Sequence, residues 1–363
     1  MKTFYWMPIC LMILMGVCNG QENGGSMSYH VYVSNNGSAF FSKFLLDTES
    51  GAVTQEDDIA LDAAPGAVAT SRDGSLMYVV LRKEKTYQSF RVNRVTGQLV
   101  PINKVSVDDG GPYLKTDNTD RFLLATYYGA GAVSVHAINE DGSVGNEPLQ
   151  WIETEEHAHS IQFDRSNRFA YVPHTNPPNA IYQFKFDEKT GELSANDPHK
   201  IQPETPEGPR HFVFHPTKDL LYSVNENGST VSAHHFDPET GRLSSFQVIS
   251  TLPDDFDGAK NSTAEIRMTK DGRFLYASNR GHDSLAIFAV SDDGGLVESG
   301  HQPTEATPRY FDLDPTGTYI FAVGQNSGRM ATYRIDQGNG SLEPLAIFEV
   351  GDSPLWIQFV PKD

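Results

Sequence analysis

Cysteine is almost absent from this sequence, and both of its cysteines lie close to the N-terminus. Cys10 and Cys18 are the only two among 363 residues. The rest of the chain can therefore form neither a disulfide nor a cysteine-ligated metal site. The sequence also lacks a nucleophile-elbow motif and a glycine-rich phosphate loop, which excludes the enzyme classes that depend on them.

Basic residues are scarce as well. The chain has 28 Lys and Arg against 47 Asp and Glu, for a net charge of −19. A surface of this sign repels nucleic acids and anionic membranes. We therefore expect neither as a partner; a surface of this sign mostly keeps a protein soluble.

Only one long hydrophobic run is present, from Phe4 to Val17, and it follows Lys2. It is shorter than the roughly 20 residues that a membrane-spanning helix needs. This pattern predicts a signal peptide over residues 1–20 and no stable membrane span, followed by a short polar tether over residues 21–28. We expect an exported protein, periplasmic or secreted.

Two processing routes remain open for this segment. Gly20 is a suitable cleavage position for an ordinary signal peptide. A lipid anchor on Cys18 is the alternative, although Val17 is bulkier than the small residue that usually precedes a lipidated cysteine. The sequence leaves this choice undecided.

Long amphipathic helical patterns are absent, and a repeat takes their place. One copy contains an apolar strand at Gly208–Pro216 and a second at Leu220–Glu226. A third follows at Thr230–Phe236, and a turn at Glu239–Gly241 leads to a fourth. A period of about 40 to 50 residues with four strands is typical of a propeller blade. Seven copies can be aligned, and each has a glycine in its last hairpin turn, where tight turns need a positive φ: Gly51, Gly97, Gly142, Gly191, Gly241, Gly294 and Gly340.

The two ends of the chain complement each other. The first copy, around Val31–Val33, lacks its innermost strand, while Ser353–Val360 matches Gly208–His215 and has no blade of its own. We therefore predict an all-β, seven-bladed β-propeller over residues 29–363. Its C-terminal strand joins the N-terminal blade and closes the ring, which removes open sheet edges. We expect a monomer.

The aligned copies differ at two positions that should share one end of the channel. One is the start of the innermost strand, and the other is the tip that follows the second strand. The strand-start positions are Gly66, Pro112, His159, Arg210, Ala264, Arg309 and Leu355. The tip positions are Asn36, Arg82, Tyr128, Thr175, Glu226, Arg280 and Gln325.

Four arginines gather at these positions, against the sign of the whole molecule. Arginine binds phosphate and carboxylate through two parallel hydrogen bonds, so the group indicates an anionic ligand. A lone arginine at a blade tip is more often only solvated. We predict His159, Arg210, Glu226 and Arg280 as catalytic residues. The predicted substrate-binding residues are Arg309, Arg82, His157, Asn225 and Gln325.

No metal or cofactor is expected at this mouth. His157 and His159 would lie on one face of an extended segment. No cluster of acidic residues accompanies them, so a Ca²⁺ site is not indicated.

Several motifs of the chain resemble the seven-bladed lactonase family, which includes the propeller-type 6-phosphogluconolactonases. The similarity extends from about Tyr29 to the C-terminus. The motifs that carry it are His159-Ser160, Gly208-Pro209-Arg210-His211, Val213-Phe214-His215-Pro216, Val224-Asn225-Glu226, Leu275-Tyr276-Ala277 with Arg280, Gln302-Pro303-Thr304-Glu305 and Pro308-Arg309.

The resemblance implies that the chain hydrolyses an anionic sugar-acid lactone. The family also includes a fungal carboxymuconate lactonising enzyme, whose proposed active-site residues are a histidine, two arginines and a glutamate. They correspond here to His159, Arg210, Arg280 and Glu226. The predicted signal peptide departs from the family pattern, because sugar-phosphate lactones are cytosolic substrates. Two alternatives remain: a lactonising reaction on a muconate, and a non-catalytic exported propeller that binds an anionic sugar or a protein.

Overall fold

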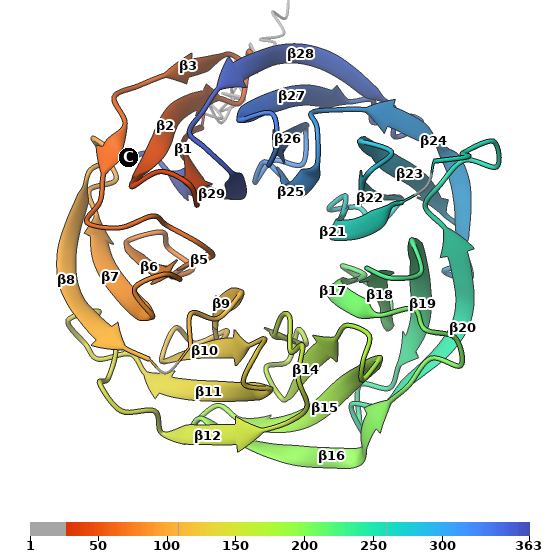
Figure 1. Cartoon of the computed structure of the whole chain (residues 1–363), viewed down its shortest axis with the longest axis horizontal. Helices are drawn as coiled ribbons and strands as arrows, with labels where there is room; N and C mark the ends of the chain where they lie inside the picture. Colours follow the sequence, from red (N-terminus) through yellow and green to blue (C-terminus); the bar gives the residue numbers. More distant parts are fainter. Residues whose placement is uncertain (1–26, 108, 259) are drawn as a thin grey trace, which may run out of the picture.

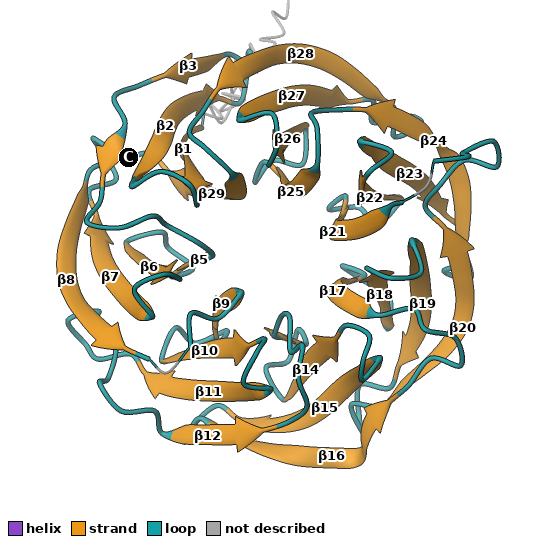
Figure 2. Cartoon of the chain, viewed as in Figure 1, coloured by secondary structure: helices purple, strands orange, loops and turns teal. Residues whose placement is uncertain are grey.

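Seven β-sheets stand around a central channel like the blades of a propeller (Figure 1). The computed structural model describes residues 27–107, 109–258 and 260–363. Within these ranges the chain consists of strands, turns and loops, without a helix (Figure 2). The predicted signal peptide, Cys18 and nearly all of the tether lie outside the described residues. The described part also has no helix of the length and apolarity required to cross a membrane.

Each sheet is antiparallel, and in six of the seven the chain runs outward from the channel, strand by strand. The first blade contains β1 (Ser28–Asn35), β2 (Phe40–Asp47), β3 (Val53–Gln55) and β4 (Ile59–Ala60), and its innermost strand is β29 (Pro354–Pro361). The second contains β5 (Val68–Thr70), β6 (Leu76–Leu81), β7 (Thr86–Val92) and β8 (Leu99–Ser106). The third contains β9 (Tyr113–Thr116), β10 (Phe122–Tyr127), β11 (Ala132–Ala137) and β12 (Gln150–Glu153).

The remaining four blades repeat this order. The fourth contains β13 (Gln162–Phe163), β14 (Phe169–His174), β15 (Ala180–Asp187) and β16 (Glu192–Ile201). The fifth contains β17 (Pro209–Phe214), β18 (Leu220–Asn225), β19 (Thr230–Phe236) and β20 (Leu243–Ser250). The sixth contains β21 (Ser262–Met268), β22 (Phe274–Arg280), β23 (Ser284–Val290) and β24 (Leu296–Pro303). The seventh contains β25 (Pro308–Leu313), β26 (Tyr319–Gly324), β27 (Arg329–Ile335) and β28 (Leu342–Glu349).

The ring closes as the sequence predicts. Strand β29 pairs with β1 over seven positions, from Tyr29 opposite Pro361 to Asn35 opposite Pro354. The last strand of the chain thereby becomes the innermost strand of the first blade (Figure 1). This pairing confirms the all-β, seven-bladed propeller and its closure.

The blades are joined by a contact that repeats around the ring. The hydroxyl of a buried tyrosine on the second strand of one blade donates a hydrogen bond to a glycine carbonyl in the last hairpin turn of the next. Tyr222, for example, reaches the carbonyl of Gly294 at 2.8 Å. The same bond links Tyr32 to Gly97, Tyr171 to Gly241 and Tyr276 to Gly340.

These turn glycines are required for two reasons. All seven have a positive φ, from 69° at Gly241 to 89° at Gly294, a conformation that is costly for other residues. A side chain from the preceding blade also packs directly against each one. A Cβ added to Gly241 would lie 2.2 Å from the ring of Phe169, so the turn fits only a glycine.

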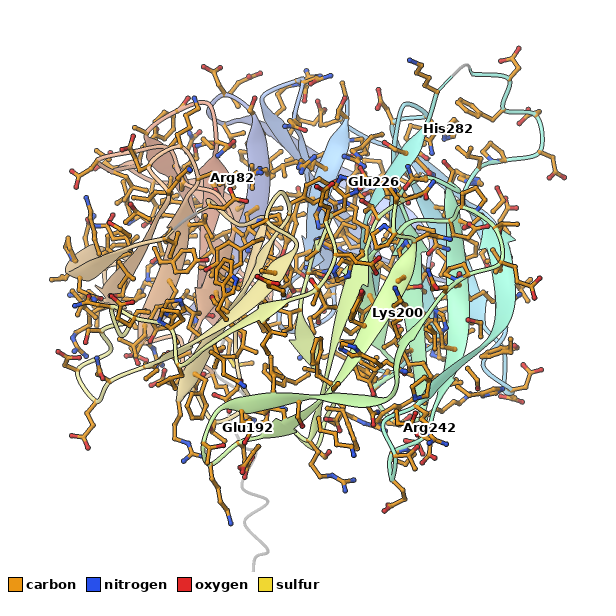
Figure 3. All side chains as sticks on the ribbon, turned by 60° about the horizontal axis from the view of Figure 1, so that its bottom comes forward. Arg82, Glu192, Lys200, Glu226, Arg242 and His282 are labelled. Carbon is orange, nitrogen blue, oxygen red and sulfur yellow. The ribbon has the colours of Figure 1, made fainter. Side chains whose placement is uncertain are left out.

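The strand-start and tip positions lie at one end of the channel. In the fifth blade Pro209 pairs with Asn225, so the start of β17 lies beside the end of β18. The sixth blade repeats this with Ser262 opposite Arg280. In Figure 3, Arg82 and Glu226 lie near one rim, whereas Glu192 and Arg242 lie near the other.

Four innermost strands have a β-bulge at their start, in β17, β21, β25 and β29. In β17 the ladder shifts between Pro209 and His211, which leaves Arg210 as the extra residue. A bulge redirects side chains that would otherwise alternate between two faces. Arg210 and His211, although adjacent, therefore both line the channel mouth.

Candidate active site

A pocket occupies the centre of this rim, and its walls come from six blades. Its lining combines arginines and a histidine with aromatic and aliphatic side chains. The lining residues are Ala67, Arg82, Pro112, His159, Arg210, His211, Arg309, Tyr310, Leu355 and Trp356. Four of the predicted site residues therefore lie in a single pocket: Arg82, His159, Arg210 and Arg309.

Glu226 lies between two arginines. Its Oε1 accepts a hydrogen bond from Nη2 of Arg280 at 2.6 Å, and its Oε2 lies 3.4 Å from Nε of Arg210. Arg210 is further held by the carbonyl of Ala264, and Arg280 by that of Thr263. This clamp fixes the directions of both guanidinium groups. His159 lines the same pocket as Arg210, so the four predicted catalytic residues lie at one rim.

Arg309 and Arg82 are differently placed. Within the described residues, no side-chain acceptor bonds either guanidinium, and Arg82 has only a 3.4 Å contact from Nε to the carbonyl of Gly110. Both line the pocket. Their terminal nitrogens are therefore available to a ligand.

Burial and mutual repulsion lower the pKa values of Arg210 and Arg309. Burial, followed by Arg309 and Arg280, lowers the pKa of Arg210 to about 9. Burial and Arg280 lower the pKa of Arg309 to about 10. Both remain cationic at neutral pH, so the group carries a net positive charge that favours an anion.

Within the described residues, Glu226 is the carboxylate that pairs with Arg210 and Arg280. Burial alone would raise its pKa, but Arg210 and Arg280 outweigh burial and lower the pKa below its ordinary value. Glu226 is therefore ionised at neutral pH. Both of its oxygens are already engaged by guanidinium groups.

His159 is buried, with 4% of its surface exposed. Burial, then the charges of Arg210 and the neighbouring His211, bring its pKa well below the ordinary value. The ring is therefore neutral at physiological pH. It contacts Tyr128 edge-on at 5.7 Å between ring centroids.

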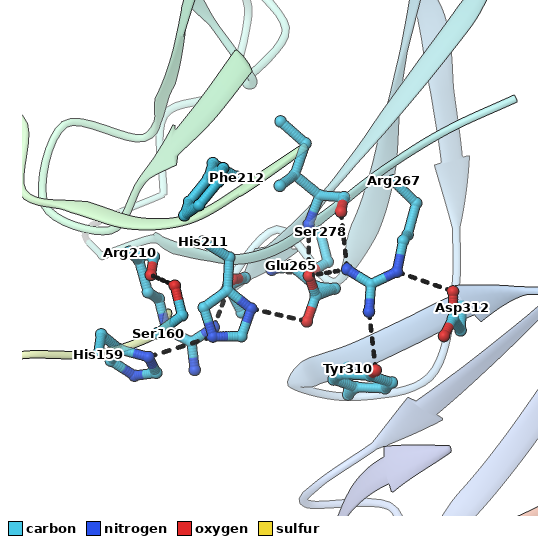
Figure 4. Close-up of polar contacts among 12 residues, drawn as sticks. His159, Ser160, Arg210, His211, Phe212, Glu265, Arg267, Ser278, Tyr310 and Asp312 are labelled. Carbon is cyan, nitrogen blue, oxygen red and sulfur yellow. Dashed lines mark hydrogen bonds and ion pairs between the residues drawn. The ribbon is translucent and has the colours of Figure 1, made fainter. Parts of the chain in front are cut away.

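A hydrogen-bonded layer extends from the lining of the pocket into the channel wall (Figure 4). It begins at His211, which contacts His159, and passes through Glu265 and Arg267 to Asp312 and Tyr310. Of this layer, His211, Arg267, Asp312 and Tyr310 were not predicted from the sequence as site residues. The Gly-Pro-Arg-His motif contains His211, but alternation along a regular strand would have turned it away from Arg210.

Aromatic rings complete the floor. Tyr310 stacks on Trp356 with 4.3 Å between ring centroids, and Tyr113 meets both Trp356 and His211 edge-on. Tyr310 and Trp356 also line a second cavity deeper in the channel. The rings thus separate the pocket from the other end of the channel and give it a partly apolar base.

Three predicted substrate-binding residues do not line this pocket. The ring of His157 lies tilted against that of Tyr128, with 4.5 Å between ring centroids, and its Nδ1 donates a hydrogen bond to the carbonyl of Pro177. Asn225 is buried in its blade, where its amide donates to Thr230 and Ser232. Gln325 lies at a blade tip, where its backbone N–H bonds Thr307.

In the described ranges, no group of three or more His, Cys, Asp or Glu side chains is arranged to hold a metal ion. The arrangement instead offers cationic hydrogen-bond donors, a neutral imidazole and a carboxylate around one pocket. Such groups can bind an anion, stabilise an oxyanion and transfer a proton.

Comparison with known proteins places this architecture in a family. Residues 28–359 match the family described as "Lactonase, 7-bladed beta-propeller". The 6-phosphogluconolactonase of Pectobacterium carotovorum is 37% identical over 289 residues, which cover 79% of this chain and 85% of the relative. The 6-phosphogluconolactonase of Xenorhabdus nematophila is 33% identical over 333 residues, with coverage of 91% and 98%.

Among solved structures, the periplasmic gluconolactonase of Pseudomonas aeruginosa superposes with a TM-score of 0.84. The match has 24% identity and covers 93% of this chain and 100% of that one. At this identity the similarity concerns the fold. The family match and the curated relatives together establish that this chain belongs to the seven-bladed β-propeller lactonase family.

Proposed function

We propose that this protein is an exported hydrolase that opens an anionic sugar-acid lactone, with 6-phosphogluconolactone as the best-fitting substrate. The observation that carries this proposal is the charge of the site. Arg82, Arg210 and Arg309 line one pocket, and Arg210 and Arg280 share one carboxylate, Glu226. The oxyanion of ring opening uses one of the remaining positive charges, which leaves others for a phosphate group.

Each group has a role in this hydrolysis. Arg210 and Arg280, held by Glu226, stabilise the oxyanion that develops when water attacks the lactone carbonyl. Arg309 and Arg82 bind the phosphate through their free terminal nitrogens. His159 or Glu226 takes the proton from water, a contribution of typically 10²–10⁴-fold to the rate. The aromatic floor packs against the carbon skeleton of the sugar.

Export follows from the N-terminal sequence, where a single apolar run precedes the propeller. The name of the Pseudomonas neighbour, a periplasmic gluconolactonase, supports a lactone substrate outside the cytoplasm. An unphosphorylated aldonolactone is therefore the second candidate substrate.

The proposal is tested by acid release in a pH-stat. The purified mature chain is added to 6-phosphogluconolactone and to δ-gluconolactone, and the rate is compared with spontaneous opening. We expect catalysed opening that Arg210→Ala reduces at least about 10²-fold, the usual loss for one oxyanion donor. If neither lactone opens faster than in buffer while both raise the melting temperature, the protein is a binding module.

A further inference from the structure

Three buried side chains form a line from the pocket into the channel wall (Figure 4). Nδ1 of His159 lies 3.1 Å from Nε2 of His211, and Nδ1 of His211 lies 2.9 Å from Oε2 of Glu265. None of the three is more than 4% exposed. Each contact is within hydrogen-bond distance, so each needs one donor and one acceptor.

Glu265 fixes the first donor. Its Oε1 accepts the backbone N–H of Ile266 at 3.0 Å and a hydrogen from Nη1 of Arg267. Burial alone would raise the pKa of Glu265, but Arg267 and His211 lower it to about 2. Glu265 is thus a carboxylate at neutral pH and can only accept hydrogen bonds.

The positions of the protons follow along the line. Because Glu265 only accepts, Nδ1 of His211 carries a proton. Burial lowers the pKa of His211 to about 4, so its ring is neutral and its Nε2 has a free lone pair. That lone pair needs a donor, so Nδ1 of His159 is protonated. A neutral His159 then has an unprotonated Nε2.

This nitrogen faces the pocket. His159 lines the pocket, and within the described residues its Nε2 has no hydrogen-bond partner yet is not one of the buried unpartnered atoms. It therefore reaches the solvent in the pocket. A lone pair at this place can accept a proton from a water beside a bound lactone.

We infer that Glu265 and His211 are positioning residues that hold His159 in this single tautomer, which makes His159, rather than Glu226, the general base of the hydrolysis. The inference rests on the proposed function. As the water oxygen bonds to the lactone carbonyl carbon, one water proton moves to Nε2. When the ring C–O bond breaks, that proton passes to the ring oxygen, and the new carboxylic acid releases its own proton to solvent.

One substitution tests this line without changing its shape. In Glu265→Gln, the amide oxygen is needed at the former Oε1 position, where the N–H groups of Ile266 and Arg267 both donate. The amide NH₂ must then face His211 and donate to its Nδ1. His211 is forced to protonate Nε2 and to donate to His159, whose own proton moves to the nitrogen facing the pocket. The base is thereby lost.

The experiment compares Glu265→Gln with Asp312→Asn. Oδ1 of Asp312 accepts a hydrogen bond from Nε of Arg267 at 2.7 Å, on the side of Arg267 away from Glu265, and Asp312 does not touch the histidines. Asp312→Asn therefore makes the same acid-to-amide change beside the same arginine. On the lactone that the wild type opens, we expect Glu265→Gln to lower kcat by about 10²-fold or more with KM within about threefold. Asp312→Asn should keep kcat within about threefold. Equal losses in the two variants, or a wild-type kcat in Glu265→Gln, would overturn the inference.

A second measurement needs no turnover and reads the tautomer of His159 in the unsubstituted protein. Two-bond nitrogen–proton couplings in the ¹⁵N-histidine-labelled protein identify the protonated nitrogen of each ring, and the peaks that vanish in His159→Gln assign His159. We expect the proton of His159 on Nδ1; a proton on Nε2 would contradict the inferred tautomer. If no lactone is opened but the Nδ1 tautomer is found, the proposed function fails, whereas the positioning of His159 by His211 and Glu265 is supported.

Discussion

At the scale of single residues, the arginines of the site have few side-chain hydrogen-bond acceptors, which leaves the site with a net positive charge. One carboxylate, Glu226, orients Arg210 and Arg280, whereas no side-chain acceptor in the described part of the chain bonds Arg309 or Arg82. A buried charge with one partner removed is costly. The roles of Glu226 as clamp and His159 as base can therefore be separated by substitution.

We predict unequal losses for the two candidate bases. Glu226→Gln keeps an acceptor for Arg280 but weakens the clamp, so kcat/KM on the preferred lactone should fall about tenfold. His159→Gln removes the base and should cost about 10²–10⁴-fold. Steady-state rates with thermal melts of both variants check this. A loss in Glu226→Gln as large as that in His159→Gln would assign the base to Glu226.

The repeats predict that these residues meet at one rim, because they occupy equivalent places in the aligned copies; their catalytic roles stay predictions. Aligned copies expose His159, Arg210, Glu226 and Arg280 as departures from a pattern. The layer beneath could not be identified in the same way. A bulge at the start of β17 places Arg210 and His211 on the same side, and such an irregularity is invisible to a two-residue period.

At the scale of the elements, the last hairpin turn of each blade determines how neighbouring blades meet. Its glycine was predicted from turn chemistry alone. The structure adds a reason that spans two blades, because the same residue receives a side chain from the blade before it. The tyrosine on the second strand and this glycine thus form a hydrogen-bonded contact between neighbouring blades that recurs around the ring.

The turn between β19 and β20 provides a test. In Gly241→Ala the alanine would have to keep the backbone φ of 69°, and its Cβ would overlap the ring of Phe169. We expect a loss of about 2–4 kcal/mol in unfolding free energy from backbone strain and overpacking together. Urea or thermal unfolding measures it.

The matched control for this substitution is Gly145→Ala. Gly145 is not a positive-φ glycine, and a Cβ there would meet its nearest atom at 3.6 Å. It should change the stability by less than about 1 kcal/mol. Equal losses at the two positions would show that the turn glycine has no special packing role.

At the scale of the whole molecule, the ring depends on a pairing between the two ends of the chain. The unmatched C-terminal repeat predicted this closure, and β29 pairs with β1 as expected. Local pattern could not predict the floor of the pocket, since Tyr113, Tyr310 and Trp356 come from three blades. Their contacts appear only after the ring has closed.

Removing the closing strand should open the ring. A chain ending at residue 353 leaves β1 as an exposed edge and deletes Trp356 from the floor. We expect aggregation or a melting temperature lower by at least about 10 °C.

The control for this truncation is a chain that ends at Pro361. It removes Lys362 and Asp363, and with them the ion pair between Asp363 and Arg94, but keeps β29. It should melt within about 3 °C of the full chain, because exposed pairs contribute little. A stable, cooperative fold without β29 would show that the closure is dispensable.

The phosphate role of the free arginines is tested by the preference for a phosphorylated lactone, measured as the ratio of kcat/KM on 6-phosphogluconolactone to that on δ-gluconolactone. We expect a ratio of at least about 10 in the wild type, since one charge-assisted hydrogen-bonded contact contributes about 1.5–3 kcal/mol. In Arg82→Gln/Arg309→Gln the ratio should approach about 1. Arg329→Gln, whose arginine is paired with Glu305 outside the pocket, should leave the ratio unchanged. A wild-type ratio near 1 that the double substitution does not alter would contradict the assignment of the free arginines to a phosphate.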